Sequence, residues 1–526
     1  MSEKKMVDAG SRVALGRRQW ISMVGGMAAA GSLGLASGDV LAQAPRRGGV
    51  LRIVAPLQPT SMDPYAGRHG NDHVYLFPAF DSLIDVDLDT LEPKPGLAQS
   101  WSFPDSTTLV LNLRPGVVFH DGTPCDAEAV RYNLERAKSH ERSNVKIDMK
   151  SVDSIAVTGP SQVTLKLTKP DSVILMTLAD RAGMMSSPTA IKAAGNEYGR
   201  VAVGAGPWRL VSWKDNEKLV YERHPQYWAK DVALLDGLEF SVIPEVNTGL
   251  RTVVAGQNDF VYGLAPQQKP IIERSGLQMV QGSTLATWQI YLNYSKPPFD
   301  NVKVRQAMHY ALDRDEFSRL TTAGMAEPTT QTLPRGHWGY DKTLEGTYKH
   351  DPKRARELLA EAGYPNGIDV EVIGRNDQRS QQQAEVLIEQ YRKSGIRLKF
   401  MNVPANELGA KFMGERIGNA AVSVYTGRVD PSQLYSIMFD KSSFINASRM
   451  EGAPGLEAAM EAARAVYDKE ARRQAVWKIQ RIVHEHALYV PLALQPELDA
   501  MSQRVKGFKP NLLGKPRFHG VWLAAS

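Results

Sequence analysis

The segment Leu113-Arg114-Pro115-Gly116-Val117-Val118-Phe119-His120-Asp121-Gly122-Thr123-Pro124 carries several local structural signals in a row. Residues 107–113, which lead into it, alternate apolar and polar side chains, as half-buried antiparallel strands do. Asp121-Gly122 is a strong turn pair. Apolar side chains then return with helical spacing over 126–137, so we expect Thr123 or Asp126 to cap a helix. The segment therefore predicts a strand, a turn and a helix, with a structural role.

Strand and helix signals are distributed differently in the two halves of the chain. The first half is rich in strands, including 49–55 and 162–168. In the second half we expect helices at 302–312, 352–362, 382–395, 456–463 and 470–486, with strands at 369–373, 397–402 and 420–425. Asp300 and Asp351 are expected N-caps of two of these helices. The pattern predicts an α/β fold with a mixed sheet, helices on its faces and at least two lobes.

The composition of the 526 residues excludes several classes of protein. With 43% hydrophobic and 23% charged residues, the chain can bury a large core. Its net charge of +6 is spread along the chain, which argues against nucleic-acid binding, because tracking phosphates needs a concentrated positive face. Cys125 is the only cysteine, which excludes disulfide bonds, iron–sulfur clusters and four-cysteine zinc sites; we expect a buried thiol.

The first 42 residues have the pattern of an export signal. Basic residues up to Arg18 precede an uncharged run over 20–37, and small residues near its end favour cleavage after Ala42. Arg17-Arg18 resembles a twin-arginine export motif, and a general secretory signal is the alternative. No cysteine follows the run, so we expect an exported, soluble periplasmic protein without a lipid anchor.

Five blocks of the chain, in order, resemble one family of proteins. They are Gly48-Gly49-Val50-Leu51-Arg52 with Ser61-Met62-Asp63-Pro64; residues 95–101 with 113–124; Gly206-Pro207-Trp208 with Pro225-Gln226-Tyr227-Trp228; residues 298–314; and residues 351–364. These blocks are similar to those of the bacterial extracellular solute-binding proteins of family 5. That family contains the oligopeptide-, dipeptide- and nickel-binding components of ABC importers.

The resemblance implies a two-lobed periplasmic binding protein of type II, similar to cluster C, with a cleft that closes at a hinge. Lobe I is expected from residues 45–81, 204–270 and 492–526, its extra subdomain from 82–203, and lobe II from 271–491. Chain crossings between the lobes are expected near 262–264 and 490–492. The implied partners are a small-molecule or peptide ligand and an ABC permease with its ATPase. We expect a monomer.

The loop Tyr425-Thr426-Gly427-Arg428-Val429-Asp430-Pro431 is the informative segment for ligand contacts. In peptide-binding relatives, the matching loop carries an aspartate that holds the α-ammonium group of the peptide. Gly427 or Arg428 stands there in this chain, which puts ordinary peptide binding in doubt. Arg428, flanked by Tyr425 and Gly427, would instead suit a carboxylate, phosphate or sulfonate. The alternatives are an ion pair of Arg428 with Asp430 or another residue, and a turn or helix cap at Asp430-Pro431.

Further ligand contacts are expected from both lobes. Arg375 follows a predicted strand and is one residue out of register with an arginine that receives the ligand carboxylate in dipeptide-binding relatives; a solvated helix start is the alternative. Trp288, like the nearby Tyr291 and Tyr294, would offer a flat wall to the ligand or belong to the core. From the first lobe we add Tyr65 and His69, because the loop after Asp63-Pro64 faces the cleft in relatives.

Catalysis and metal binding have little support in the sequence. The nucleophile-elbow, phosphate-loop and dinucleotide motifs are absent from it. His69 with His73, and His484 with His486, lack a third metal ligand at a motif spacing. We therefore expect a binding protein for an acid-bearing solute, not an enzyme, with no metal and no cofactor. Short peptides held differently, glutathione-like or opine-like compounds, chelated nickel, and a hydrolase on the same scaffold are the alternatives.

Overall fold

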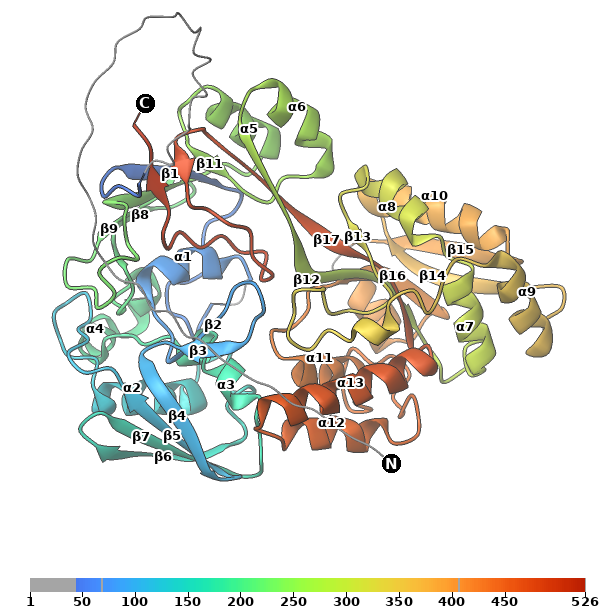
Figure 1. Ribbon diagram of the computed structural model, residues 1–526, viewed down its shortest axis with the longest axis horizontal. Coiled ribbons are helices and arrows are strands. Elements are labelled where there is room, and N and C mark those ends of the chain that lie inside the picture. Colours follow the sequence, from blue (N-terminus) through green and yellow to red (C-terminus); the bar gives the residue numbers. More distant parts are fainter. Residues whose placement is uncertain (1–43, 68–69, 405–406, 526) are drawn as a thin grey trace, which may run out of the picture. The chain divides into compact units, whose positions relative to one another are not determined.

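The computed structural model describes residues 44–67, 70–404 and 407–525, and Pro45–Ser526 form one compact unit. Its largest sheet has eleven strands in the order β15-β14-β16-β12-β17-β11-β1-β10-β9-β8, with β13 (Glu327–Pro328) beside β17 (Figure 1). The predicted export signal, residues 1–42, lies outside the described residues. Among the helices that the structure describes, none combines the length and apolar character that a bilayer crossing requires.

The first lobe is built around β1 (Val50–Ala55), the strand predicted over 49–55. β1 pairs in parallel with β10 and β11, and β10 continues antiparallel into β9 and β8. The bounds of the first-lobe elements are β8 (Trp208–Lys214), β9 (Lys218–Arg223), β10 (Gly237–Val242), β11 (Phe260–Val261), α1 (Asp72–Ala79), α5 (Val246–Val254) and α6 (Lys269–Arg274). The C-terminal residues Phe508, Phe518 and Val521 are buried in the core of this lobe, so the chain returns to it at its end.

A separate four-stranded antiparallel sheet, β4-β5-β7-β6, and its helices form what we call the subdomain. Its elements are β2 (Ile84–Val86), β3 (Pro93–Pro95), β4 (Ala98–Asp105), β5 (Thr108–Leu113), α2 (Ala127–Ser139), β6 (Val152–Gly159), β7 (Gln162–Leu167), α3 (Ile174–Thr177) and α4 (Pro188–Ala194). β5 and β7 confirm the strands predicted from alternation over 107–113 and 162–168. The subdomain has its own hydrophobic core, distinct from that of the first lobe.

The turn and the helix predicted from residues 113–124 are present. The carboxylate of Asp121 accepts a hydrogen bond from the Thr123 amide at 3.0 Å. Asp126, rather than Thr123, caps α2, because its carboxylate accepts from the Ala129 amide at 2.9 Å. Cys125 is buried, as predicted, and burial raises the pKa of its thiol.

The second lobe alternates helices and strands, as predicted. Its elements are α7 (Val302–Tyr310), α8 (Arg314–Thr322), α9 (Pro352–Glu361), β14 (Ile368–Arg375), α10 (Gln378–Arg392), β15 (Ile396–Val403), β16 (Ala420–Tyr425), α11 (Pro431–Phe439), α12 (Leu456–Arg464) and α13 (Lys469–Glu485). Asp351 caps α9 as expected. The cap predicted at Asp300 is wrong: Asn301, which directly precedes α7, accepts the hydrogen bond from the Lys303 amide.

Two long antiparallel strands, β12 (Gln278–Leu292) and β17 (Tyr489–Met501), connect the first and second lobes. One end of β17 pairs with β11 of the first lobe, and the other half of β12 pairs with β16 of the second. The pairing register of β12 with β17 is interrupted between Ser283 and Thr287. This interruption lies farther along the chain than residues 262–264, near which the first crossing between the lobes was predicted. Figure 1 shows both strands passing between the two groups of elements.

Candidate ligand-binding site

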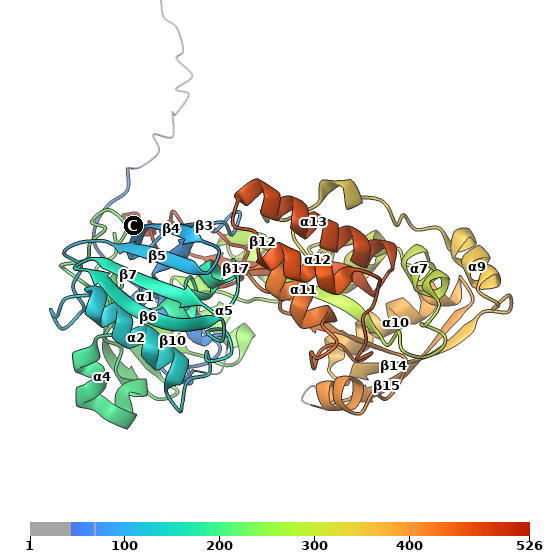
Figure 2. The same ribbon diagram turned by 90° about the horizontal axis from the view of Figure 1, so that it is seen from below.

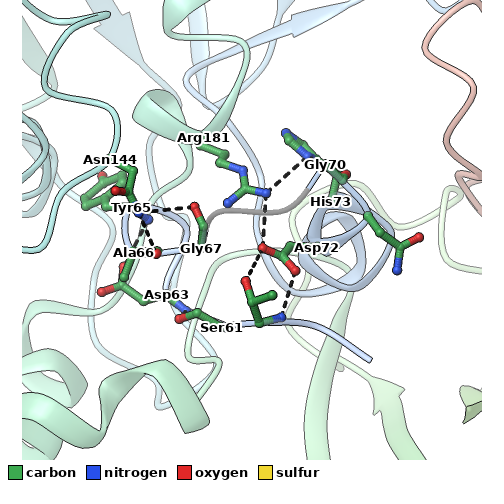
Figure 3. Close-up of polar contacts among 12 residues, drawn as sticks. Ser61, Asp63, Tyr65, Ala66, Gly67, Gly70, Asp72, His73, Asn144 and Arg181 are labelled. Carbon is green, nitrogen blue, oxygen red and sulfur yellow. Dashed lines mark hydrogen bonds and ion pairs between the residues drawn. The ribbon is translucent and has the colours of Figure 1, made fainter. Parts of the chain in front are cut away.

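The loop that leads into α1 is held by polar contacts to the subdomain (Figure 3). Arg181 donates to the Asp72 carboxylate at 3.3 Å, and the same carboxylate accepts from the amide and the hydroxyl of Thr60 at 2.8 and 2.7 Å. Asn144 donates to the carbonyl oxygen of Ala66 at 2.7 Å. Buried carboxylates are stable when they are paired and hydrogen-bonded in this way. The loop therefore presents α1 in a defined position.

His73, on α1, is the centre of a charged cluster. Its Nε2 lies 2.5 Å from the Asp180 carboxylate, and its Nδ1 lies 3.3 Å from Lys515 Nζ. Burial lowers the pKa of His73, Lys515 lowers it further, and Asp180 opposes both. The ring is therefore neutral near pH 7. Its Nδ1 also lies 3.1 Å from the carbonyl oxygen of Gly70. Because the Asp180 side chain is 54% exposed, this cluster reaches solvent.

Lys515 lies in the C-terminal segment that returns to the first lobe. Burial lowers the pKa of Lys515 to about 8; Asp180 opposes this shift, and Arg181, Arg517 and Arg428 add to it. Arg517 forms an ion pair with Asp85 at 2.8 Å. By contrast, Lys515 forms no ion pair with any residue that the structure describes. Lys515 is thus a first-lobe cation without a partner carboxylate in the described chain.

Arg428 approaches the same region from the second lobe, in the loop after β16. Its side chain is exposed, and its Nη1 donates only to the Gly427 carbonyl, at 2.8 Å, among the described residues. The alternative ion pair with Asp430 does not form, because Asp430 is fully buried, pairs with Arg472 and caps α11. The charge of Arg428 helps to lower the pKa of Lys515, so Arg428 contributes to the electrostatic environment of the first-lobe lysine.

Tyr425 and Asp148 lie near Arg428. The buried hydroxyl of Tyr425 has no hydrogen-bond partner within the described residues; burial raises the pKa of Tyr425 to about 12, and Arg428 opposes that shift. Asp148, from the subdomain, accepts from Gln433 of the second lobe at 3.3 Å. Burial raises the pKa of Asp148, with Asp180 adding to the shift and Arg428 opposing it. Polar groups of both lobes therefore converge around Arg428.

Gly427 sets the direction of this loop. Its φ of +72° is in the left-handed region, and a Cβ there would lie 2.5 Å from the carbonyl oxygen of Leu285 on β12. Only glycine meets both requirements without strain. Its close packing against β12 gives Gly427 a structural part in orienting Arg428.

Replacing Gly427 with alanine is expected to destabilise the protein by about 2–4 kcal/mol, because left-handed strain and overpacking add. Gly455→Ala is the matched control: Gly455 has a φ of +77°, and a Cβ added there would meet none of the described atoms within 4 Å. The control should lose only the strain contribution, about 1–2 kcal/mol. Urea unfolding measures both variants, and equal losses would contradict the packing role.

Four other predicted site residues lie elsewhere or cannot be placed. Arg375, at the end of β14, pairs with Asp377 at 3.0 Å, and Asp377 caps α10. Trp288 lies on β12 with 6% exposure, within the core of the second lobe. Tyr65 is buried at 1% exposure, and its hydroxyl donates to the Met184 carbonyl at 3.2 Å. His69 lies outside the described residues. Ligand contact by these four residues stays a prediction.

Sequence reasoning missed three first-lobe or subdomain members of the cluster, Asp180, Arg181 and Lys515. By sequence, His73 is a candidate only for metal binding, beside His69. Within the described ranges, groups of three or more side chains able to hold a metal ion are absent. In the segment Gly514-Lys515-Pro516-Arg517, two basic residues stand beside glycine and proline, which favour turns. This local signal could have identified Lys515.

Comparisons with known proteins agree on one family. The model of "Bacterial extracellular solute-binding proteins, family 5 Middle" matches residues 92–446. The glutathione-binding protein GsiB of Pectobacterium atrosepticum is 29% identical over 374 residues, which cover 70% of this chain and 72% of that protein.

Solved structures show the same fold. HbpA2 from Haemophilus parasuis has a TM-score of 0.82 at 23% identity, covering 91% of this chain and 100% of that chain. The unliganded, open murein-tripeptide-binding protein MppA also has a TM-score of 0.82, at 17% identity, covering 92% and 98%.

These findings confirm the two-lobed, type II periplasmic-binding-protein fold. The family match shows a solute-binding protein. The family model and the GsiB relatives are both described as binding proteins. Since the family model matches more than half of the length of this chain, the chain belongs to the bacterial extracellular solute-binding proteins of family 5.

Proposed function

We propose that this protein captures an acid-bearing solute between its lobes, holding the acid between Arg428 and Lys515, and delivers it in the periplasm to a membrane permease. It acts as a monomer after export through the signal in residues 1–42. The observation that carries the proposal is the pair of cations, one from each lobe, without an ion-pair partner in the described residues.

The physical argument rests on like-charge repulsion. Two cations that approach each other as the lobes close oppose closure, unless an anion lies between them. An anion that contacts both cations stabilises the closed form more than the open form, and this difference drives the population shift. Arg428 suits a planar carboxylate through paired hydrogen bonds, and Lys515 adds a point charge.

The relatives support a ligand of this class. The GsiB proteins are named for glutathione, which carries two carboxylates. A peptide-like or glutathione-like compound would place one acid group between the cations. Asp148 and Asp180, close by, would receive a basic or amino group of the same molecule.

Native mass spectrometry of protein purified from its own periplasm tests the proposal. We expect a co-purifying small molecule with at least one acid group, which then binds to the emptied protein in isothermal titration calorimetry. A neutral or purely cationic co-purifying molecule would contradict it. So would failure to bind glutathione, dipeptides and dicarboxylates when nothing co-purifies.

The affinity for this acid is expected to fall as the pH rises through about 8, because Lys515 then loses its proton. At one unit above that pKa about a tenth of the lysine is charged, so binding should be roughly tenfold weaker at pH 9 than at pH 6.5. Carboxylic acids are ionised throughout this range, and His73 is neutral, so neither masks the effect.

Calorimetry at several pH values measures this dependence, and Lys515→Met is the control. The variant should bind more weakly at pH 6.5 and show a flat profile between pH 7 and 9. A wild-type profile that is equally flat would show that Lys515 does not contact the acid.

A further inference from the structure

A cavity of about 400 Å³ opens on the subdomain, between α2, α4 and the loop that joins β1 to α1. Figures 1 and 2 both show α2 and α4 side by side. The residues that line the cavity all lie between 63 and 199 in the chain, and none of them belongs to the cluster around Arg428 and Lys515. Small-molecule sites typically have volumes of roughly 300–1,000 Å³. This space, which we call the subdomain cavity, is therefore separate and large enough for a small molecule.

The floor of the subdomain cavity is a buried ion pair between Asp63 and Arg136. Their side chains are 6% and 9% exposed, and Arg136 donates to both carboxylate oxygens, from Nη1 at 3.0 Å. The rings of Tyr65 and Tyr198 flank the guanidinium, with their centroids 5.2 and 5.8 Å from its carbon. The two charges of the pair compensate each other, so the floor adds no net charge to the cavity.

Arg142 lies at the edge of the subdomain cavity with an exposed side chain. Its Nη1 donates to the carbonyl oxygen of Asn196 at 3.1 Å, which holds the guanidinium beside the cavity. It forms no ion pair with a residue that the structure describes. Because a guanidinium has five N–H donors, Arg142 keeps donors and an uncompensated charge for a carboxylate.

His140, two residues before Arg142, adds a neutral donor to the same edge. The backbone amide of Arg142 donates to its Nδ1 at 3.2 Å. Burial lowers the pKa of His140, the charges of Arg136 and Arg142 lower it further, and Asp63 opposes the shift. With the ring neutral and Nδ1 acting as an acceptor, the proton lies on Nε2. His140 therefore offers an N–H donor near the Arg142 guanidinium.

Glu135, on α2, brings the opposite charge to the subdomain cavity. Its side chain is half-buried, and its carboxylate forms no ion pair within the described part of the chain. Arg142 and Glu135 thus line one cavity without pairing with each other, which leaves two opposite charges uncompensated. A small molecule that carries both signs of charge would compensate both of them.

We propose that the subdomain cavity is a second binding site, which takes a zwitterion such as a free amino acid. The α-carboxylate accepts from Arg142 and His140, and the α-ammonium group lies against Glu135. Tyr132 and Ile191 also line the cavity and offer an apolar surface to the side chain of the ligand. A purely anionic or purely cationic molecule would pair with one of the two charges and leave the other unpaired.

This inference goes beyond the proposed capture of an acid, because it concerns another part of the molecule. Binding in the subdomain cavity does not depend on how the lobes are arranged, since every lining residue belongs to the first lobe or to the subdomain. The two cations of the proposed acid site can therefore be removed while the subdomain cavity is tested.

Isothermal titration calorimetry with L-phenylalanine and L-leucine tests the site in a variant that combines Arg428→Met with Lys515→Met. Unfolding and refolding the full mature chain removes bound solute beforehand. We expect at least one of the two amino acids to bind. Its amine analogue (phenethylamine or isopentylamine) and its acid analogue (3-phenylpropionate or 4-methylpentanoate) should each bind about tenfold more weakly or worse, because one charge of the cavity then stays unpaired.

Added to that combined variant, Arg142→Met and Glu135→Gln should each weaken binding of the amino acid by about tenfold or more. Arg131→Met and Glu141→Gln are the matched controls, because both side chains are exposed and neither lines the cavity. The controls should bind like the combined variant. Circular dichroism checks folding. Should the combined variant fail to fold, Arg142→Met and Arg428→Met are compared singly in the wild type, and only the former should lose the amino acid.

No binding of either amino acid would overturn the second site. So would equal affinity for an analogue that lacks one charge, or full affinity in Arg142→Met or in Glu135→Gln. Because the combined variant lacks Arg428 and Lys515, none of these results bears on the proposed capture of an acid between the lobes, which calorimetry on the wild type tests separately.

Discussion

Arg428→Met is expected to weaken binding of the co-purifying acid by about 2–5 kcal/mol, the usual loss when one partner of a desolvated charge pair is removed. Methionine keeps the length of the side chain but removes its charge and donors. Arg428 is available for this role because its guanidinium has only the Gly427 carbonyl as a partner among the residues described. Without the Arg428 guanidinium, Lys515 would be the only cation left to bind the acid group of the solute.

Isothermal titration calorimetry measures the loss, with circular dichroism to check folding. Arg392→Met is the matched control, since Arg392 is an arginine of the same lobe whose ion pair with Glu389 lies on the surface of α10. We expect the control to bind like the wild type. Unchanged affinity in Arg428→Met would remove Arg428 from the site and with it the main support for an acid-bearing solute.

Arg472→Met is expected to lower the free energy of unfolding by about 3–5 kcal/mol, because it leaves a buried carboxylate without its counterion. Asp430 is fully buried and lies 2.5 Å from Arg472, which is itself 9% exposed at its side chain. The amides of Ser432 and Gln433 would remain as the only donors to Asp430 among its described neighbours. Two amides of a helix cap stabilise a carboxylate less than they do together with a charge-assisted hydrogen bond from a guanidinium.

Urea unfolding followed by circular dichroism checks this loss. Arg473→Met, one residue away on α13, is the control, because Arg473 forms a partly exposed pair with Glu470 within the helix, worth about 0.3–0.5 kcal/mol. A loss below about 1 kcal/mol in Arg472→Met would mean that Asp430 is neutralised or reaches water, and that the pair does not hold the loop after β16.

Local features of the fold followed the sequence closely. Strand β16, Ala420–Tyr425, has the predicted bounds, and Asp126 and Asp351 cap the helices that they precede. Such features depend on a few neighbouring residues, so pattern and propensity suffice to predict them. The exception at Asp300 has the same origin: two adjacent residues were both able to cap, and the backbone position of the helix start decided for Asn301.

The candidate site was only half predictable. Arg428 and Tyr425 were identified from the loop after β16, but their setting was not. Arg375 was an equally good candidate by sequence, and only the structure shows that Asp377 already pairs with it. Tyr65 and Trp288 have aromatic side chains of the kind that often line ligand-binding sites. The structure buries both, with exposures of 1% and 6%.

The sequence by itself determined the family, the alternation of strands and helices, the helix caps and the buried Cys125. Each of these features depends on neighbouring residues or on short blocks of sequence along the chain. Only the tertiary structure decided which charges meet. His73 and Lys515 are 442 residues apart in the chain and 3.3 Å apart in space. The charge of Arg428, in the other lobe, helps to lower the pKa of Lys515. Charge interactions depend on distance and burial, neither of which a linear order of residues contains.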